Sequence, residues 1–341
     1  MCCLFGLIDV NHQLSGSEKN RIFSILAEAS EARGTDATGY ACNSHGKLII
    51  EKQPLPAHRM KFRIPKDAPI IMGHTRMTTQ GSAQKRINNH PFLGRMTSNI
   101  ATSNIQFALA HNGVISNDDT LRASHDLPHS KIETDSYVAV QLIEKQNTFD
   151  LNTLKYMAEQ VKGTFTFTLL DRKDRLYIIK GNNPLCLFHF KKAGLYLYAS
   201  TRPILEEALE EMGYAGVPHE EIKIKDGEIL VIDSNGTITR DQFKAPVSHN
   251  SFCPIYDFWE PVEIAPTGYR KWMMDYAMTI GIPKKELDWL HYAGYPTYDI
   301  EEAIFNKNYR NICLLESGYF DESEDEVYEF DYDYFSCPAW M

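Results

Sequence analysis

Short apolar runs separated by polar turn residues fill most of the first 240 positions and predict strands joined by tight turns. The expected strands are Cys2–Val10, Tyr40–Cys42, Leu48–Ile50, Ile70–Thr75, Phe107–His111, Thr164–Leu170, Leu176–Lys180, Leu185–Phe190 and Leu195–Ala199. Asn43–Lys47 joins two of them as a hairpin, and Asp226-Gly227 and Asn235-Gly236 predict two tight hairpins within Ile222–Thr239. Since hairpins connect antiparallel neighbours, we expect mainly antiparallel sheets.

Apolar residues at helical spacing predict four helices in the same region. The first is expected to begin after Ser17 as its N-cap and to place on one face Ile22, Ile25, Leu26 and Ala29. The other three are Asp135–Glu144, Leu151–Val161 and Ile204–Met212. Strands, a helix pair and strands again are typical of packed sheets with helices outside, so the predicted fold class is a layered α+β domain.

Charge and aromatic residues divide the chain near residue 250. The formal net charge is −10, but residues 251–341 alone hold 18 acidic and 6 basic side chains, while residues 1–250 hold 27 and 29. All 4 tryptophans and 11 of the 18 tyrosines also lie beyond residue 250. We therefore expect a main domain over residues 1–250 and an acidic, aromatic-rich extension over residues 251–341.

Within this extension the pattern predicts three short helices, Thr267–Thr279, Lys284–His291 and Ile300–Phe305. Asp321–Asp333 then contains eight acidic residues, and such a run is expected to be solvated or bound to a partner.

Composition excludes several classes of protein. Neither part carries a basic stripe, so nucleic acid is not expected as a partner. The sequence has neither a signal-peptide pattern nor an apolar run long enough for a membrane helix, which predicts a cytoplasmic protein without a membrane partner. Seven cysteines without metal-ligand spacing fit neither a disulfide framework nor a zinc site, and are expected to be reduced thiols.

Cys2 is the first candidate for chemistry, because removal of Met1 would leave a thiol and a free α-amine on one residue. An α-amine titrates at about 7.7–8.0 and can act as a base near neutral pH. The alternative is a small buried residue at the start of a strand, since free cysteines are commonly buried.

Five motifs follow Met-Cys in order: Arg33-Gly34-Thr35-Asp36-Ala37-Thr38-Gly39, Gly73-His74-Thr75-Arg76-Met77-Thr78-Thr79-Gln80-Gly81, Asn89-His90-Pro91, His111-Asn112-Gly113 and Glu133-Thr134-Asp135. In this arrangement they closely resemble the class II glutamine amidotransferases, most of all the glutaminase domain of glucosamine-phosphate synthases. The resemblance runs from residue 1 to roughly residue 240. It implies an N-terminal-nucleophile hydrolase fold, with layers in the order αββα.

The resemblance also implies roles for single residues. Cys2 would be the nucleophile, with Asn112 and Gly113 as donors to the oxyanion; the alternative for the last two is an ordinary Asn-Gly turn. Arg76 would bind the α-carboxylate of a free amino acid and Asp135 its ammonium. The alternatives are a surface salt bridge for Arg76 and a charge at a helix N-terminus for Asp135.

Five further residues match positions near the nucleophile or the pocket. Arg33, Gly34 and Asp36 would support the chain terminus, although a structural ion pair between Arg33 and Asp36 is equally compatible with the sequence. Thr79 and His90 match pocket-lining positions. His74, His90 and His111 lack metal-ligand spacing, and no metal site is expected.

Departures from the family pattern also matter. Cys3 stands where the family usually has Gly, Met77 replaces a usual Trp that helps gate ammonia passage, and Gln80 replaces a usual His. Beyond residue 250 we find no sugar-isomerase, phosphoribosyl pyrophosphate or nucleotide-binding signature. An ammonia acceptor is therefore expected in another polypeptide.

Together these features predict a stand-alone, Cys-dependent glutaminase that acts on L-glutamine without a cofactor. Two alternatives remain open: an amidohydrolase of the same fold acting on another carboxamide, and a non-catalytic glutamine-sensing scaffold.

Overall fold

The computed structural model describes residues 2–10, 12–97 and 104–244, and then residues 277–278, 280–293, 295, 300, 303–304, 306–317 and 319. The chain divides into two compact units, Met1–Trp272 and Met273–Met341. The predicted boundary near residue 250 lies outside the described residues.

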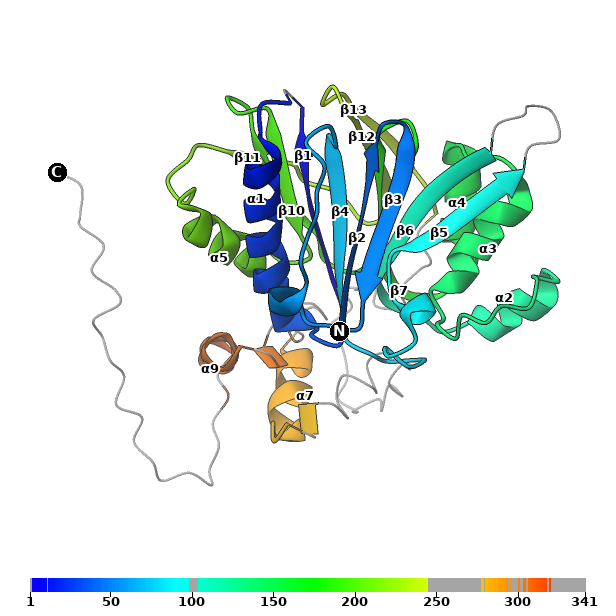
Figure 1. The fold of residues 1–341 in the computed structure, drawn as a ribbon. Coiled ribbons are helices and arrows are strands. Elements are labelled where there is room, and N and C mark those ends of the chain that lie inside the picture. Colours follow the sequence, from blue (N-terminus) through cyan, green and yellow to red (C-terminus); the bar gives the residue numbers. More distant parts are fainter. Residues whose placement is uncertain are drawn as a thin grey trace. The chain divides into compact units, whose positions relative to one another are not determined.

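The first unit contains two antiparallel sheets (Figure 1). The seven-stranded sheet has the order β11-β9-β10-β1-β4-β2-β3. Its strands are β1 (Cys3–Asp9), β2 (Ala37–Ser44), β3 (Lys47–Gln53), β4 (Ile70–Arg76), β9 (Cys186–Phe190), β10 (Leu195–Ala199) and β11 (Glu220–Glu221). β1 therefore lies in the middle of the sheet, between β10 and β4.

The six-stranded sheet has the order β13-β12-β8-β7-β6-β5. Its strands are β5 (Phe92–Thr97), β6 (Asn104–Ile115), β7 (Gly163–Asp171), β8 (Arg175–Lys180), β12 (Glu228–Asp233) and β13 (Ile238–Gln242). Every ladder in both sheets is antiparallel, which confirms the prediction made from the hairpin signals.

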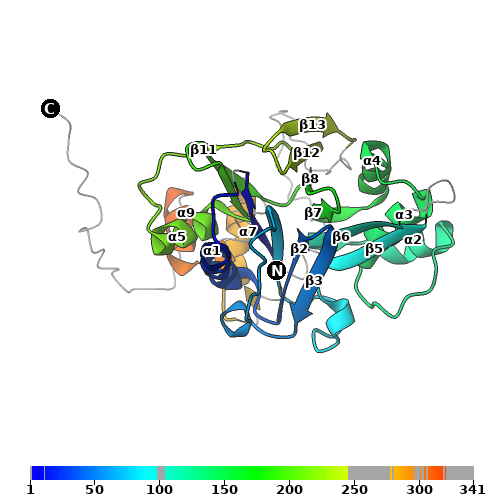
Figure 2. The ribbon, with the colours of Figure 1, turned by 45° about the horizontal axis from the view of Figure 1, so that its top comes forward.

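Helices cover the outer face of each sheet, as Figures 1 and 2 show. α1 (Gly16–Ala29) and α5 (Arg202–Met212) pack on the seven-stranded sheet, and α3 (Tyr137–Gln146) and α4 (Leu151–Gln160) on the other. A third core, with Leu4, Ile8 and Ala108 among its members, fills the space between the sheets. The layers therefore run αββα, which confirms the predicted fold class.

Shorter helices complete the first unit. They are α2 (Asp118–Ser124) and three 3-10 turns, η1 (Ser30–Arg33), η2 (Ala57–Arg59) and η3 (Arg86–Asn88). α2 and β5 were not predicted from the sequence. α2 has only Leu121 and Ala123 as apolar residues, and β5 is interrupted by Gly94 and Arg95, so neither gives a clear periodic signal.

Two local predictions are wrong. α1 is capped by Ser15 and not by Ser17, because Glu18 lies three residues after Ser15 and the two side chains bond reciprocally to the backbone as a capping box. Asp226-Gly227 does not close a hairpin, because β11 pairs with β9 in one sheet while β12 pairs with β8 in the other. Asn235-Gly236 does form the predicted turn, between β12 and β13.

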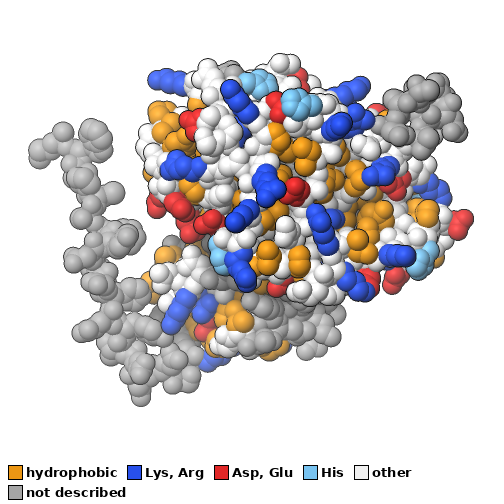
Figure 3. Space-filling view, in the orientation of Figure 1, with side chains coloured by type: hydrophobic (Ala, Val, Ile, Leu, Met, Phe, Trp, Pro, Cys, Tyr) orange, Lys and Arg blue, Asp and Glu red, His pale blue; other side chains and the backbone are white. Residues whose placement is uncertain are grey.

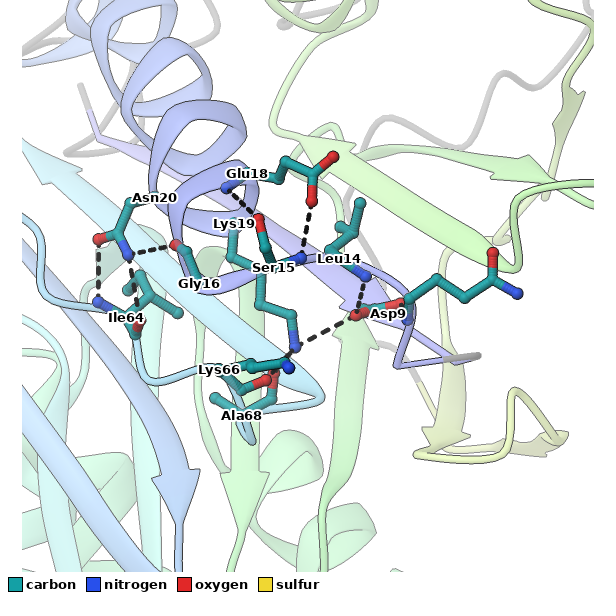
Figure 4. Close-up of polar contacts among 11 residues, drawn as sticks. Asp9, Leu14, Ser15, Gly16, Glu18, Lys19, Asn20, Ile64, Lys66 and Ala68 are labelled. Carbon is teal, nitrogen blue, oxygen red and sulfur yellow. Dashed lines mark hydrogen bonds and ion pairs between the residues drawn. The ribbon is translucent and has the colours of Figure 1, made fainter.

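A buried ion pair anchors the end of β1 that is far from Cys2 (Figure 4). Lys19 of α1 lies 3.2 Å from Asp9, and both side chains are almost fully buried. Lys19 also donates to the carbonyls of Lys66 and Ala68, at 2.8 and 2.7 Å. A buried ion pair is tolerated only when the other hydrogen-bonding groups of both side chains are also satisfied. These bonds together fix α1 against β1.

The second unit contains α7 (Lys284–Tyr292) and α9 (Lys307–Glu316). Trp289 donates from its indole to the hydroxyl of Ser317 at 3.1 Å, and its ring lies 5.8 Å from that of Tyr319. α7 confirms the helix expected at Lys284–His291. Residues 277–278 are helical and belong to the helix expected at Thr267–Thr279. The rest of that helix, half of the one expected at Ile300–Phe305, and the acidic run Asp321–Asp333 lie outside the described residues.

Lysine and arginine side chains are scattered over the face shown in Figure 3, with acidic ones among them. In the part of the chain that the structure describes, no helix is long and apolar enough to cross a membrane. The cytoplasmic location expected from composition stays a prediction.

Candidate active site

The candidate nucleophile lies where strands β1, β2 and β4 meet at one end of the seven-stranded sheet. β4 runs antiparallel to both neighbours, with Cys3 opposite Thr75 and Ala37 opposite Arg76. Cys2 is half-buried, and its thiol points to the carbonyl of Met77 at 3.6 Å. Its own carbonyl accepts a hydrogen bond from Nε of Arg33 at 3.0 Å. The structure thus places Arg33 against the backbone of Cys2.

Burial raises the pKa of the Cys2 thiol, while the positive chain terminus, the contact with Met77 and the charges of Arg76 and Arg33 oppose that effect. The thiol at rest is therefore protonated near neutral pH. A base must remove the proton before the sulfur can attack a carbonyl, and the α-amine of a processed N-terminus is the nearest candidate.

Gly34 and Asp36 hold the segment that follows β4. A Cβ atom on Gly34 would lie 2.6 Å from the backbone nitrogen of Met77, so only glycine allows this close approach. Asp36 donates from its backbone to the carbonyl of Arg76 at 2.9 Å, and its carboxylate accepts from the backbone of Thr78 at 2.7 Å. These contacts fix the backbone that faces Cys2.

Asn112 and Gly113 lie in β6, on the facing sheet. The side-chain amide of Asn112 donates to Ser200 Oγ at 3.3 Å, and its backbone carbonyl accepts from Nδ2 of Asn183 at 2.8 Å. Gly113 has φ +142°, and a Cβ there would lie 2.6 Å from the carbonyl carbon of Thr164. The pair is therefore part of a strand, which rules out the ordinary Asn-Gly turn.

Arg76 is a buried cation held by neutral groups. It donates to Oδ1 of Asn89 at 2.6 Å and to the carbonyls of Gln80 and Gly81 at 2.5 and 3.4 Å. Among the described residues, no carboxylate lies within ion-pair distance of it, which rules out a surface salt bridge within that part of the chain. Burial lowers its pKa, against the opposing charges of Cys2, Asp36 and Asp135. Such a group favours an anionic ligand.

Asp135 is a buried carboxylate that precedes α3. It accepts from the backbone of Ile115 at 2.6 Å and from the hydroxyl of Ser136 at 3.4 Å. Burial raises its pKa to about 6, although these hydrogen bonds oppose the shift. Its backbone N–H donates to the side chain of Gln80 at 3.1 Å. Gln80 therefore connects Asp135 to Arg76.

Thr79 and His90 differ in their placement. Thr79 is exposed, and no hydrogen bond of its side chain is found among the residues described. His90 is buried, with its ring 4.2 Å from that of His74 and 4.4 Å from that of Phe92. Neither ring nitrogen of His90 has a partner within the described part of the chain. Burial holds the pKa of His90 well below its usual range, so the ring is neutral.

His74 and His111 form one buried network with Ser136. Nε2 of His74 donates to the carbonyl of His111 at 3.0 Å, and Nδ1 of His111 lies 2.8 Å from the hydroxyl of Ser136. Burial lowers the pKa of each histidine to about 3. Across the described ranges, no group of three His, Cys, Asp or Glu side chains is arranged to hold a metal ion.

Four contributors to the site were missed by reasoning from the sequence. Asn89 and Gln80 stand inside the quoted motifs but were given no role, and each holds Arg76. Ser200 and Asn183 support Asn112, yet they are 88 and 71 residues away from it. Asn89 could have been found as the polar neighbour of His90, whereas nothing local marks Ser200 or Asn183.

Parts of the chain are similar to known proteins. Residues 97–207 match a family model described as a glutamine amidotransferase domain. The chain is 30% identical over 231 residues to glutamine–fructose-6-phosphate aminotransferase of Staphylococcus aureus, covering 64% of this chain and 36% of that protein. It is 25% identical over 249 residues to 7-cyano-7-deazaguanine synthase of Saccharolobus solfataricus, covering 70% and 50%.

A solved structure shows the same fold. Glutamine phosphoribosylpyrophosphate amidotransferase from B. subtilis aligns with a TM-score of 0.55 at 21% identity, over 71% of this chain and 49% of that one. The chain thus spans between about a third and a half of the length of these proteins.

Proposed function

We propose that this chain, which carries a glutamine amidotransferase domain of the class II type, hydrolyses the side-chain amide of L-glutamine through a thioester on Cys2. The products are glutamate and ammonia. The half-reaction uses only groups of the protein and water, so we propose no cofactor.

The observation that carries this proposal is the pair of buried, opposite charges on Arg76 and Asp135. Neither side chain is neutralised by an ion pair among the described residues, and Gln80 connects the two. A buried charge without a counter-ion is unfavourable until a ligand supplies one. A free α-amino acid supplies both, with its carboxylate toward Arg76 and its ammonium toward Asp135. This arrangement favours glutamine over a carboxamide that lacks an α-amino acid group.

In the proposed reaction the α-amine of Cys2 takes the thiol proton as the sulfur attacks the amide carbon. Asn112 and Gly113 donate hydrogen bonds to the oxyanion that develops there. The ammonium of Cys2 then protonates the leaving nitrogen, and ammonia departs as the thioester forms. Water, deprotonated by the same amine, cleaves the thioester and releases glutamate.

The ammonia is proposed to pass to an acceptor protein outside these 341 residues. The candidate contact surface is the extension of residues 251–341, because its tryptophans and tyrosines suit a binding surface and its acidic run can attract a basic partner. Met77, which accepts the thiol hydrogen bond of Cys2 at its carbonyl, stands where the family usually has the gating Trp. We therefore do not propose the conventional ammonia tunnel.

The direct test measures ammonia release from glutamine together with the intact mass of the protein. We expect Met1 to be absent, wild-type protein to release ammonia, and Cys2→Ala to abolish release while its circular dichroism stays unchanged. Cys3→Ala is the matched control, since Cys3 is a fully buried thiol next in sequence, and its effect should be small. Equal losses in the two variants would contradict the assignment of the nucleophile.

A further inference from the structure

Leu4, two residues after the candidate nucleophile, is held on both sides within the seven-stranded sheet. Its backbone N–H donates to Ser200 Oγ at 2.8 Å, where the chain leaves β10. On its other side it faces His74 of β4. Ser200 and His74 are both fully buried. The start of β1 is therefore fixed by these two neighbours.

The same two neighbours reach across to the facing sheet. Ser200 Oγ, which accepts from Leu4, also accepts from Nδ2 of Asn112 at 3.3 Å. His74 donates to the carbonyl of His111, the residue just before Asn112, at 3.0 Å. A hydroxyl oxygen has two lone pairs, so Ser200 can accept both bonds at once. Ser200 thus joins the start of β1 to β6, and His74 joins the neighbouring strand β4 to β6.

We propose that Ser200 is a positioning residue for the reaction, because its hydroxyl oxygen fixes the amide of Asn112 relative to Cys2. This inference rests on the proposed function. A side-chain amide has two N–H groups. With one bonded to Ser200, the other is left in a fixed direction for the oxyanion, and such preorganised donors are effective because they need not reorient during the reaction.

Removal of the hydroxyl should slow turnover without weakening the binding of glutamine. Ser200→Ala leaves the amide of Asn112 and the N–H of Leu4 without their acceptor. A small displacement of a reacting group can reduce rate by about 10²-fold. We therefore expect kcat to fall by about 10–100-fold while KM stays within about twofold, because within the described ranges no hydrogen bond joins Ser200 to Arg76 or Asp135.

The decisive measurement is non-additivity with Asn112→Ala. If Ser200 acts through Asn112, the double variant should be no more than about twofold slower than Asn112→Ala alone. If Ser200 contributed only to general stability, the loss of kcat in the double variant would instead be the product of the losses in the two single variants. Ser30→Ala is the matched control, because Ser30 is equally buried and donates to a helix carbonyl, that of Leu26 at 2.7 Å. Its kcat should equal that of the wild type.

Two further measurements make the test independent of how Ser200→Ala folds. Ser200→Thr keeps the hydroxyl oxygen, and Ser200→Val has nearly the shape of the Thr variant without that oxygen. The kcat of Ser200→Thr should therefore be at least tenfold higher than that of Ser200→Val. In the wild type, the amide hydrogen of Leu4 should exchange slowly with solvent.

An unchanged kcat in Ser200→Ala, additive losses in the double variant, equal rates for Thr and Val, or rapid exchange at Leu4 would each overturn the role of Ser200. If wild-type protein releases no ammonia from glutamine, the proposed function fails instead, and the exchange at Leu4 alone decides whether Ser200 fixes this strand.

Discussion

Replacement of Asp135 by Asn should separate substrate binding from stability, because the two effects have opposite signs. Asn keeps an oxygen that can accept from the backbone of Ile115, and the bond is 2.6 Å long in the native protein. It removes only the charge. A hydrogen bond to a charged group contributes about 1.5–3 kcal/mol, so the dissociation constant for glutamine should rise by about 10–150-fold.

Stability should change in the other direction. The pKa of Asp135 is raised to about 6 by burial, while an unfolded Asp titrates near about 3.9. A raised carboxyl pKa means that the folded state is favoured at low pH and loses that advantage as pH rises through about 6. At pH 7 this difference of about 2 pKa units opposes folding by about 3 kcal/mol at most. Asp135→Asn should therefore be more stable than wild type at pH 7 and similar to it near pH 4.

Calorimetric titration in a Cys2→Ala background measures binding without turnover. Glutaramate, which is glutamine without its α-amine, serves as the control ligand. It should bind the Cys2→Ala parent and the same protein with Asp135→Asn equally weakly. Glutamine binding to the parent should also weaken about tenfold per pH unit below pH 6, and binding to Asp135→Asn should not. An equal penalty for glutamine and glutaramate, or a loss of stability at pH 7, would refute the assigned role of Asp135.

Three further predictions concern other parts of the molecule. Asn112→Ala should lower kcat by about 10²–10³ with little change in KM, and wild-type activity in steady-state assays would contradict its role as an oxyanion donor. His74, His90 and His111 have lowered pKa values and Asp135 a raised one, so between pH 6 and 5 unfolding should take up about two net protons. Urea titrations should then show stability falling by about 3 kcal/mol over that interval, and a flat profile would show that the rings are not buried as neutral groups. Truncation after residue 250 should preserve ammonia release but abolish co-purification of an acceptor from native cells; an unfolded product would instead place the expected helices Thr267–Thr279 and Lys284–His291 in the main core.

The layered fold and most of its strands could be predicted because each strand is an apolar run bounded by polar turn residues. Which strands pair depends on residues far apart in the chain, and a local turn signal cannot report it. The Asp226-Gly227 turn shows the difference, since the strands on its two sides belong to different sheets. The wrong N-cap of α1 is another kind of error. Glu18, three residues after Ser15, is visible in the sequence, and it indicates Ser15 and not Ser17 as the N-cap.

The candidate site likewise contains residues that the sequence could predict and a residue that it could not. Arg33, Gly34, Arg76, Asn112 and Asp135 could be proposed from motifs. In the structure Arg33 bonds to Cys2, Gly34 lies against Met77, Gln80 connects Arg76 to Asp135, and Asn112 bonds to Ser200. Ser200 could not, because it follows an ordinary apolar strand and its contact with Leu4 spans 196 residues. A residue whose proposed role depends only on the pairing of β10 with β1 is not marked by any motif in the sequence around it.

The central place of β1 in its sheet also sets an order of events during synthesis. One neighbour of β1 is β4, which ends at Arg76, but the other is β10, which ends at Ala199. One side of β1 therefore stays unpaired until β10, which begins at Leu195, has also left the ribosome. The candidate nucleophile is therefore synthesised well before β10 and the hydroxyl of Ser200, which lie almost two hundred residues further along the chain. A chain whose synthesis stops before residue 200 would carry Cys2 without Ser200, which holds the start of β1.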